Sequence, residues 1–146
     1  MKKFLMSLTV ATMAMSMMAM PSMAGKKLAP ATIAGATTVD AAQVIEIIDE
    51  VDDLVIVDSR KVKDFVAGRI DGSINIISTD TNAETLGAAL ESKDSPVLFY
   101  CNGVKCGRAA VAAEIAVEAG YTKVYYYYNG MAEWKEQGLP VVTGEE

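Results

Sequence analysis

Two cysteines in one short stretch are the residues best suited to chemistry in this chain of 146 residues. Cys101 and Cys106 are its only cysteines, and Lys105 and Arg108 lie beside them. A thiol near cations and close to the start of a helix ionises more readily, and the thiolate is its nucleophilic form. Cys101 is therefore the candidate catalytic nucleophile. The alternative is an inert buried thiol at the end of a strand.

Cys101 lies between a predicted strand and a predicted helix. Residues 97–100 form a short apolar run behind a proline, which is typical of a buried strand, and the alanine-rich residues 107–119 favour a helix. Glycines between them let the backbone curl and point several N–H groups inward. We expect an anion-binding loop, whose candidate substrate-binding residues are Asn102, Gly103, Val104, Lys105, Cys106, Gly107 and Arg108.

The rest of the chain alternates between helical and strand patterns. Asp40 is a candidate N-cap for a helix with Val44 on its buried face, and Val111 is expected to face the sheet from the helix after the cysteines. Further helices are predicted at residues 61–67, 83–92 and 131–137, and strands at 54–57, 70–76, 97–100 and 124–128. This order predicts an α/β fold with three layers and a mainly parallel sheet of about five strands. Cys101 then lies at the carboxyl edge of the sheet, where such folds bind ligands.

The first 24 residues have the pattern of a signal peptide. Two lysines precede an uncharged apolar run at residues 4–20, and a small-x-small motif ends at Ala24. We expect cleavage near Ala24 and a periplasmic or secreted protein; the alternative is an uncleaved membrane anchor. Residues 25–37 are predicted to be a flexible lead-in, followed by one domain over residues 38–144.

Composition excludes several classes of function. Without the leader the chain has 11 basic and 19 acidic residues, a formal charge of −8, which argues against nucleic acid or acidic membrane surfaces as partners. The chain contains no histidine, so catalysis by a serine–histidine or cysteine–histidine pair and a histidine-ligated zinc site are excluded. Two cysteines alone cannot build a structural zinc site, and we expect neither a metal nor a cofactor. Cysteine chemistry in an oxidising compartment remains.

Four segments carry a resemblance to a known family. They are LVIVDSR at 54–60, GRIDGSINI at 68–76, VLFYCNG at 97–103 and an ending that starts with NGMAEW at 129. In this order they resemble the single-domain rhodanese family, which is thiosulfate sulfurtransferase-like. The resemblance implies a five-stranded parallel sheet and transfer of sulfane sulfur through a persulfide on Cys101. Thiosulfate or a similar anion would be the donor, and cyanide or a thiol the acceptor.

The chain also departs from the family pattern. Many members have arginine at the fifth position after the nucleophile, but here that residue is Cys106, and Arg108 follows two positions later. The cation that contacts the donor is then Lys105, Arg108 or neither. Cys106 is a resolving thiol, a disulfide partner or a bystander. Arg69 replaces the usual histidine and is predicted to be a solvated charge.

The family pattern also implies a role for two charged residues. Asp58 and Arg60 follow a strand next to the expected site, and we expect them to form a structural frame around the loop.

Two other classes of function compete with sulfur transfer. A phosphatase or arsenate reductase on the same fold would need arginine at the sixth position after the nucleophile, where this chain has Gly107. The stronger alternative is a sulfur carrier without turnover, or a thiol–disulfide exchange protein, that uses Cys101 and Cys106 with an exported protein partner. In both cases we expect no stable membrane insertion after leader cleavage.

Overall fold

Five parallel strands form a single sheet in the order β1-β5-β4-β2-β3. They are seen in a computed structural model that describes residues 27–145. The strands are β1 Ala36–Val39, β2 Val55–Asp58, β3 Ile74–Asn75, β4 Val97–Tyr100 and β5 Val124–Tyr127. The predicted α/β fold with a parallel sheet is confirmed, and β4, which leads to Cys101, is the central strand.

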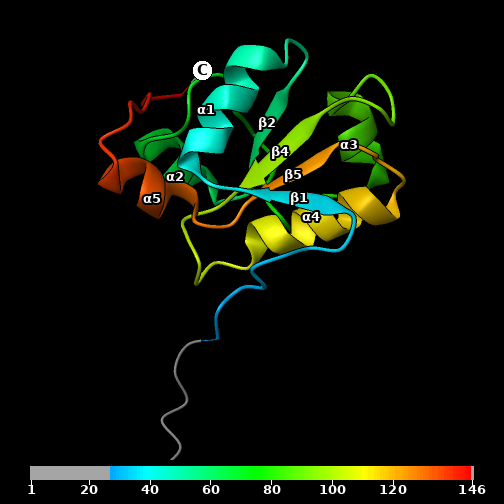
Figure 1. Cartoon of the computed structure of the whole chain (residues 1–146), viewed down its shortest axis with the longest axis horizontal. Coiled ribbons are helices and arrows are strands. Elements are labelled where there is room, and N and C mark those ends of the chain that lie inside the picture. Colours follow the sequence, from blue (N-terminus) through cyan, green and yellow to red (C-terminus); the bar gives the residue numbers. More distant parts are fainter. Residues whose placement is uncertain (1–26, 146) are drawn as a thin grey trace, which may run out of the picture.

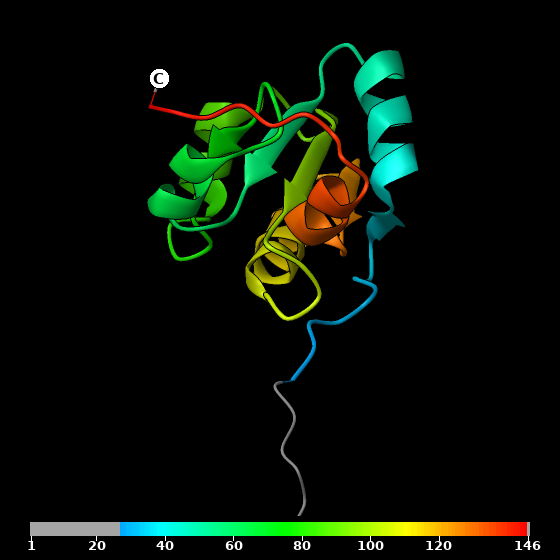
Figure 2. The same cartoon turned by 90° about the vertical axis from the view of Figure 1, so that its left-hand side faces the viewer.

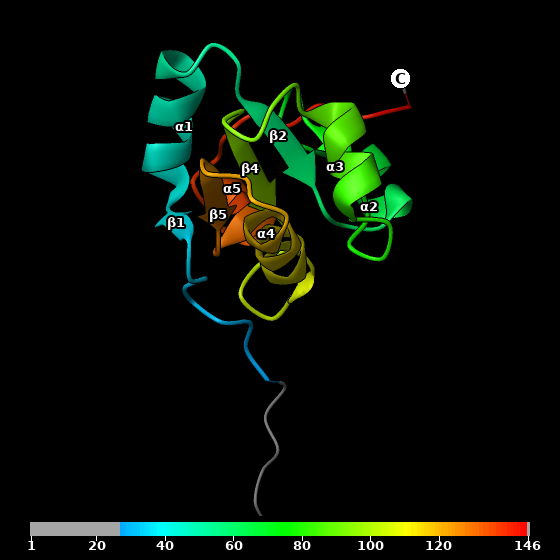
Figure 3. The same ribbon diagram turned by 90° about the vertical axis from the view of Figure 1, so that its right-hand side faces the viewer.

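Helices cover both faces of this sheet. They are α1 Ala41–Glu50, α2 Val62–Ala67, α3 Ala83–Ala89, α4 Arg108–Glu118 and α5 Gly130–Glu136. One buried cluster joins residues of α1 and α5 to the sheet, and a second joins α3 and α4 to its other face. Figure 1 and Figure 3 show α1 and α4 on opposite sides of the strands.

Local sequence explains where the helices begin. Asp40 accepts a hydrogen bond from the backbone N–H of Gln43 at 2.9 Å, and the Gln43 side chain accepts one from the N–H of Asp40 at 3.0 Å. This capping box satisfies two backbone donors that the first turn of α1 would otherwise leave unpaired. Asn82 caps α3 in the same way, with Thr85 as its partner. The predicted cap at Asp40 is confirmed.

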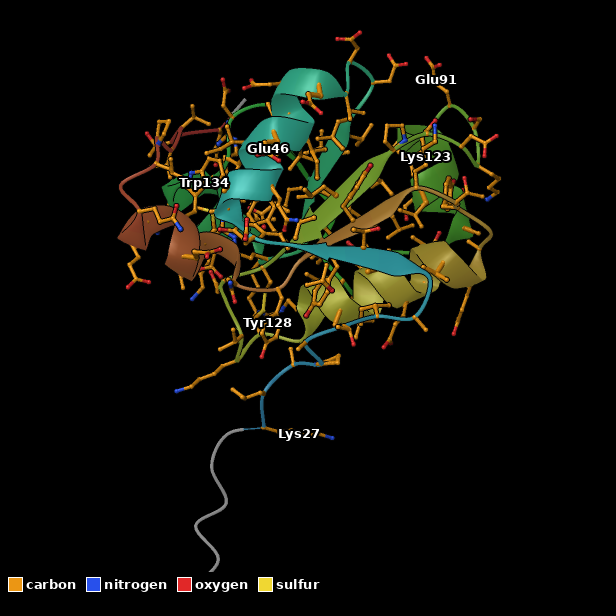
Figure 4. All side chains as sticks on the ribbon, in the orientation of Figure 1. Lys27, Glu46, Glu91, Lys123, Tyr128 and Trp134 are labelled. Atoms are coloured by element: carbon orange, nitrogen blue, oxygen red, sulfur yellow. A yellow bond between two sulfur atoms is a disulfide. The ribbon has the colours of Figure 1, made fainter. Side chains whose placement is uncertain are left out.

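The central strand is buried on both faces, as expected for a parallel sheet covered by helices. Val97 and Phe99 belong to the cluster on the α3 and α4 side, whereas Leu98 and Tyr100 belong to the cluster on the α1 and α5 side. Two residues labelled in Figure 4 belong to the two faces: Trp134 is in the cluster that includes α1, and Tyr128 packs against the cluster that includes α4.

Two predictions about packing against the sheet are wrong. The flexible lead-in was placed over residues 25–37, but Ala36 and Thr37 belong to β1 and pair with β5, and Ile33 is buried. Val111, which was predicted to face the sheet, is 46% exposed. Small alanines, among them Ala109 and Ala113, fill that interface and let α4 lie close to the strands.

The end of the chain returns to the segment after α2. Arg69 and Val142 pair as an isolated antiparallel bridge, with N–H to carbonyl distances of 3.0 Å in both directions. Figure 2 shows this red segment running past α2. Within residues 27–145 no helix is long and apolar enough to cross a bilayer. The predicted signal peptide lies outside the described residues.

Candidate functional site

Cys101 is the first residue after the central strand. Its neighbours on the sheet are the ends of β2 and β5, so polar groups that follow these strands converge on the same edge. The cysteine is only 2% exposed and belongs to the same buried cluster as Ala109 and Ala110 from the first turn of α4. Its loop leads directly into this eleven-residue helix, whose positive N-terminal end stabilises a nearby anionic sulfur.

Cys101 and Cys106 form a disulfide across the loop. Their Cα atoms are 6.2 Å apart, within the range usual for disulfides. A backbone hydrogen bond from the N–H of Cys106 to the carbonyl of Gly103, 2.9 Å long, closes the turn that brings the two sulfurs together. Of the three roles considered for Cys106, that of disulfide partner is the one that the structure contains.

The start of α5 holds the first residues of the loop. The N–H groups of Met131 and Ala132 donate to the carbonyls of Cys101 and Asn102, both at 2.9 Å. Gly130 makes this approach possible: its φ is +56°, and a Cβ there would collide with the carbonyl of Cys101. The position of Cys101 is thus set by a second element as well as by its own strand.

Asp58 and Arg60 form a buried ion pair beside the loop. The Nε of Arg60 donates to both carboxylate oxygens of Asp58 at 2.9 and 3.0 Å, and Nη2 donates to Oδ2 at 2.6 Å. Nη2 also reaches the carbonyl of Gly68 at 2.8 Å. The remaining nitrogen, Nη1, donates to Oδ1 of Asn102 at 3.3 Å, so the ion pair contacts the loop directly. Asp58 and Arg60 thus have the geometry of the structural frame that was expected.

Tyr100 is a member of this frame that sequence reasoning missed. Its hydroxyl donates to Oδ2 of Asp58 at 2.7 Å and lies 3.1 Å from Oγ of Ser73. Burial, together with the charge of Asp58, raises the pKa of Tyr100 well above its ordinary value. In the sequence Tyr100 looks like one more apolar residue of a buried strand. Its contact with Asp58 follows from the register of β2 and β4, which places the two residues side by side.

Arg69 is not the solvated charge that was predicted. It is 4% exposed, and its guanidinium lies 4.3 Å from the centre of the Phe65 ring and donates to the carbonyl of Gly144 at 2.7 Å. The C-terminal segment covers Arg69, and a contact between residues this distant in sequence cannot be inferred from a local pattern. Arg69 therefore stabilises the end of the chain and is separate from the cysteine loop.

The loop borders an open pocket of about 790 Å³. Sequence reasoning had identified seven of its lining residues, Asn102 to Arg108, but had not found Ser78, Val111 and Ala132. Lys105 is exposed, and Nη1 of Arg108 lies 3.6 Å from Sγ of Cys106. Cations and a helix start at one pocket suit a small anion, and the adjacent sulfurs suit nucleophilic or exchange chemistry.

Comparisons with known proteins agree with this geometry. Residues 40–137 match the family model described as Rhodanese-like domain. The uncharacterized protein YibN of Escherichia coli is 35% identical over 95 residues, which are 64% of this chain and 64% of that protein, so the match spans less than two thirds of either.

Two solved structures with named activities share the fold. A thiosulfate sulfurtransferase from Pseudomonas aeruginosa aligns with a TM-score of 0.65 at 21% identity, covering 75% of this chain and 21% of that one. A polysulfide-sulfur transferase homodimer from Wolinella succinogenes aligns with a TM-score of 0.62 at 22% identity, covering 75% and 80%. These TM-scores show a common fold. With the family model matching most of the domain, the chain belongs to the family of rhodanese-like domains.

Proposed function

We propose that this protein is a sulfurtransferase in which Cys101 carries sulfane sulfur as a persulfide. The observation that supports this most directly is the position of Cys101, which lies after the central strand, at the first turn of α4, and in a loop bordered by Lys105 and Arg108. Thiolate, donor and persulfide are all anions, so the same positive surroundings favour each of them. The activities named for the two solved structures are consistent with this chemistry.

The proposed reaction has two displacements. In the first, the Cys101 thiolate attacks the outer sulfur of thiosulfate or a similar donor, the S–S bond of the donor breaks, and sulfite leaves with the electron pair. In the second, cyanide or a thiolate attacks the outer sulfur of the persulfide, and the Cys101 thiolate is released. A covalent relay of this kind divides one difficult transfer into two easier ones.

The disulfide adds a requirement to this scheme. Cys101 bonded to Cys106 cannot act as a nucleophile, so the chain must be reduced before thiosulfate can load it. Reduction by exchange needs an external dithiol: its first thiolate attacks one sulfur of the disulfide and releases the other as a thiolate, and its second resolves the mixed disulfide and leaves as the oxidised dithiol. In the periplasmic or secreted location that we propose from the leader, a protein dithiol is a suitable reductant.

A loading experiment tests the proposal. Reduced protein is incubated with thiosulfate, persulfide is measured by intact mass, and cyanide is then added while thiocyanate is followed. We expect loading and thiocyanate formation in the wild type and neither in Cys101→Ser. Full activity in Cys101→Ser would overturn the assignment.

Cys106→Ser is the matched control for the same experiment. It should load at Cys101 without prior reduction, because it has no second thiol with which to close a disulfide. We also expect its persulfide to have a different lifetime, since Cys106 can no longer attack it. If Cys101→Ser and Cys106→Ser behave alike, the division of roles between the two sulfurs is wrong.

The disulfide also favours a second candidate function, thiol–disulfide exchange or sulfur carriage without turnover. In that case the protein would accept one sulfur atom or two electrons and pass them to an exported partner. Counting distinguishes the two functions: thiocyanate in large excess over protein indicates an enzyme, whereas one equivalent per chain indicates a carrier.

A further inference from the structure

The two sulfurs of the disulfide differ in access. Cys101 is 2% exposed and does not line the pocket, whereas Cys106 is half-buried and does. A small nucleophile that enters the pocket therefore reaches Cys106 first. Since thiol–disulfide displacement requires approach to the sulfur that is attacked, the geometry favours attack on Sγ of Cys106.

The pocket also selects for charge. Lys105 and Arg108 line it, and none of its described lining residues carries a carboxylate, although the whole chain has a formal charge of −6. Arg108 donates to Sγ of Cys106 across 3.6 Å. An anionic nucleophile is thus attracted to Cys106, and a persulfide formed there would lie next to the guanidinium cation of Arg108.

Cys101 is in turn a suitable leaving group. It shares a buried cluster with Ala109 and Ala110 at the start of α4, where the helix dipole stabilises negative charge. A thiol with a lowered pKa leaves faster in a disulfide displacement. Access to Cys106 therefore sets the direction of cleavage, and the start of α4 stabilises the thiolate that Cys101 becomes.

We propose that the oxidised protein captures hydrosulfide at Cys106. HS⁻ attacks Sγ of Cys106, the bond to Cys101 breaks, and the electron pair leaves on Cys101 as a thiolate; the product is a Cys106 persulfide that keeps the incoming sulfur and its proton. The disulfide is the two-electron oxidant, so one turnover needs no other. This activity goes beyond the proposed sulfurtransferase, because it starts from the oxidised chain and does not use thiosulfate.

The sequence itself provides a way to locate the captured sulfur. Trypsin cleaves after Lys93, Lys105 and Arg108, so Cys101 falls in the peptide 94–105 and Cys106 in the peptide 106–108. Oxidised protein is mixed with sodium sulfide without oxygen, quenched with iodoacetamide at increasing times, and digested without reductant. We expect one added sulfur per chain, first on the peptide with Cys106.

Several outcomes would overturn the proposal: added sulfur that appears first on Cys101, a disulfide that stays intact, or a disulfide that opens without retaining sulfur. Reduced wild type, Cys101→Ser and Cys106→Ser should all take up none, since none of them has the disulfide. Thiosulfate loading of the reduced protein is independent of this test, so a failure of capture is distinct from a failure of the proposed function.

A pair of charge variants tests the role of the cation. Arg108→Gln should slow capture by about threefold or more, because one nearby charge that attracts the anion is lost. Lys123→Gln is the matched control, since Lys123 precedes β5 at the end of the sheet opposite the loop and does not line the pocket (Figure 4). Equal slowing in both variants would show that only the net charge matters and would overturn the role of Arg108.

Discussion

Two neighbouring sites at the carboxyl edge of the sheet each contain an arginine: the frame of Asp58 and Arg60 at the end of β2, and the loop 101–108 after β4. They differ in how far their charged groups are buried and bonded. In the frame, Asp58 and Arg60 are 0% and 1% exposed and bond to each other. In the loop, Arg108 is half-buried beside a pocket, and its hydrogen-bond acceptor among residues 27–145 is a weak one, Sγ of Cys106. The charged groups of the frame are bonded to each other and to neighbouring described residues, whereas the loop presents cations and a sulfur atom to the pocket.

The comparison indicates a division of work between stability and chemistry. A buried ion pair has a well-defined geometry but loses much of its Coulomb energy to desolvation. The hydrogen bond from Arg60 to Asn102, 3.3 Å long, positions the loop relative to this ion pair. Changes in the frame should therefore alter folding first, and changes in the loop should alter sulfur chemistry first.

Breaking the frame should have the largest effect on stability. Arg60→Gln leaves the Asp58 carboxylate buried without its cation, and we expect a loss of about 3–5 kcal/mol in the free energy of unfolding, measured with urea. Lys61→Gln is the control, because Lys61 is next to Arg60 in the sequence but its side chain is exposed. This substitution should change the free energy of unfolding by less than about 0.5 kcal/mol. A loss below 1 kcal/mol in Arg60→Gln would contradict a stabilising frame.

The contact between α5 and the loop should rank second. Gly130→Ala places a side chain at φ +56° against the carbonyl of Cys101, and we expect a loss of about 2–3 kcal/mol. Gly138→Ala has a similar φ of +68° with no heavy atom near the added Cβ, so it isolates the backbone cost of about 1 kcal/mol.

Thermal unfolding of both glycine variants checks this ranking. If they lose equal stability, the close approach of Gly130 to Cys101 does not constrain the loop.

Much of this architecture could be predicted from local patterns. The two-faced apolar run of β4 identified a buried parallel strand, and the glycines and alanines after it identified the loop and α4. Strand β1 was missed because its four residues lie at the edge of the sheet and pair only with β5. Its stability comes from that pairing, which its own sequence does not encode.

The same limit applies to the candidate site: its main residue could be predicted, but the partner of that residue could not. The type and position of Cys101 follow from its place after a strand, but the bond to Cys106 depends on how the turn closes. Likewise Arg69 donates a hydrogen bond to the carbonyl of Gly144, 75 positions away, and the sequence around Arg69 does not predict that contact. What the sequence does not encode locally is the tertiary partner of each polar group.

High pH should lower the free energy of unfolding gradually, through buried tyrosines that include Tyr100 of the frame. Burial and the charge of Asp58 raise the pKa of Tyr100, and burial raises the pKa of Tyr126 to about 12. Above about pH 10 the unfolded chain loses these protons while the folded chain keeps them, so the free energy of unfolding falls as pH rises. We expect a slope of about 1.4 kcal/mol per pH unit for each such tyrosine.

Urea unfolding of the oxidised protein from pH 8 to pH 11 checks this slope. Tyr100→Phe should have a shallower slope than the wild type, because it lacks one of the phenols with a raised pKa. An unchanged slope in Tyr100→Phe would remove Tyr100 from the frame.

Two buried serines give the smallest and most specific test of the comparison. Oγ of Ser73 donates to the carbonyl of Ile70 at 2.7 Å and contacts the hydroxyl of Tyr100, so it belongs to the frame. Oγ of Ser59 is equally buried but has no hydrogen-bond partner among the described residues. Since the two side chains are identical, they differ only in whether the hydroxyl is bonded.

Replacing each serine by alanine should therefore have unequal effects in the oxidised protein. Ser73→Ala removes a made hydrogen bond and leaves the hydroxyl of Tyr100 with one contact fewer, which should cost about 1–2 kcal/mol by urea unfolding. Ser59→Ala removes a buried hydroxyl that has no bond to lose, so stability should stay within about 0.5 kcal/mol of the wild type or rise. A larger loss in Ser59→Ala than in Ser73→Ala would mean that the Ser59 hydroxyl is hydrogen-bonded after all. The bonded frame would then extend past Asp58 and closer to Cys101.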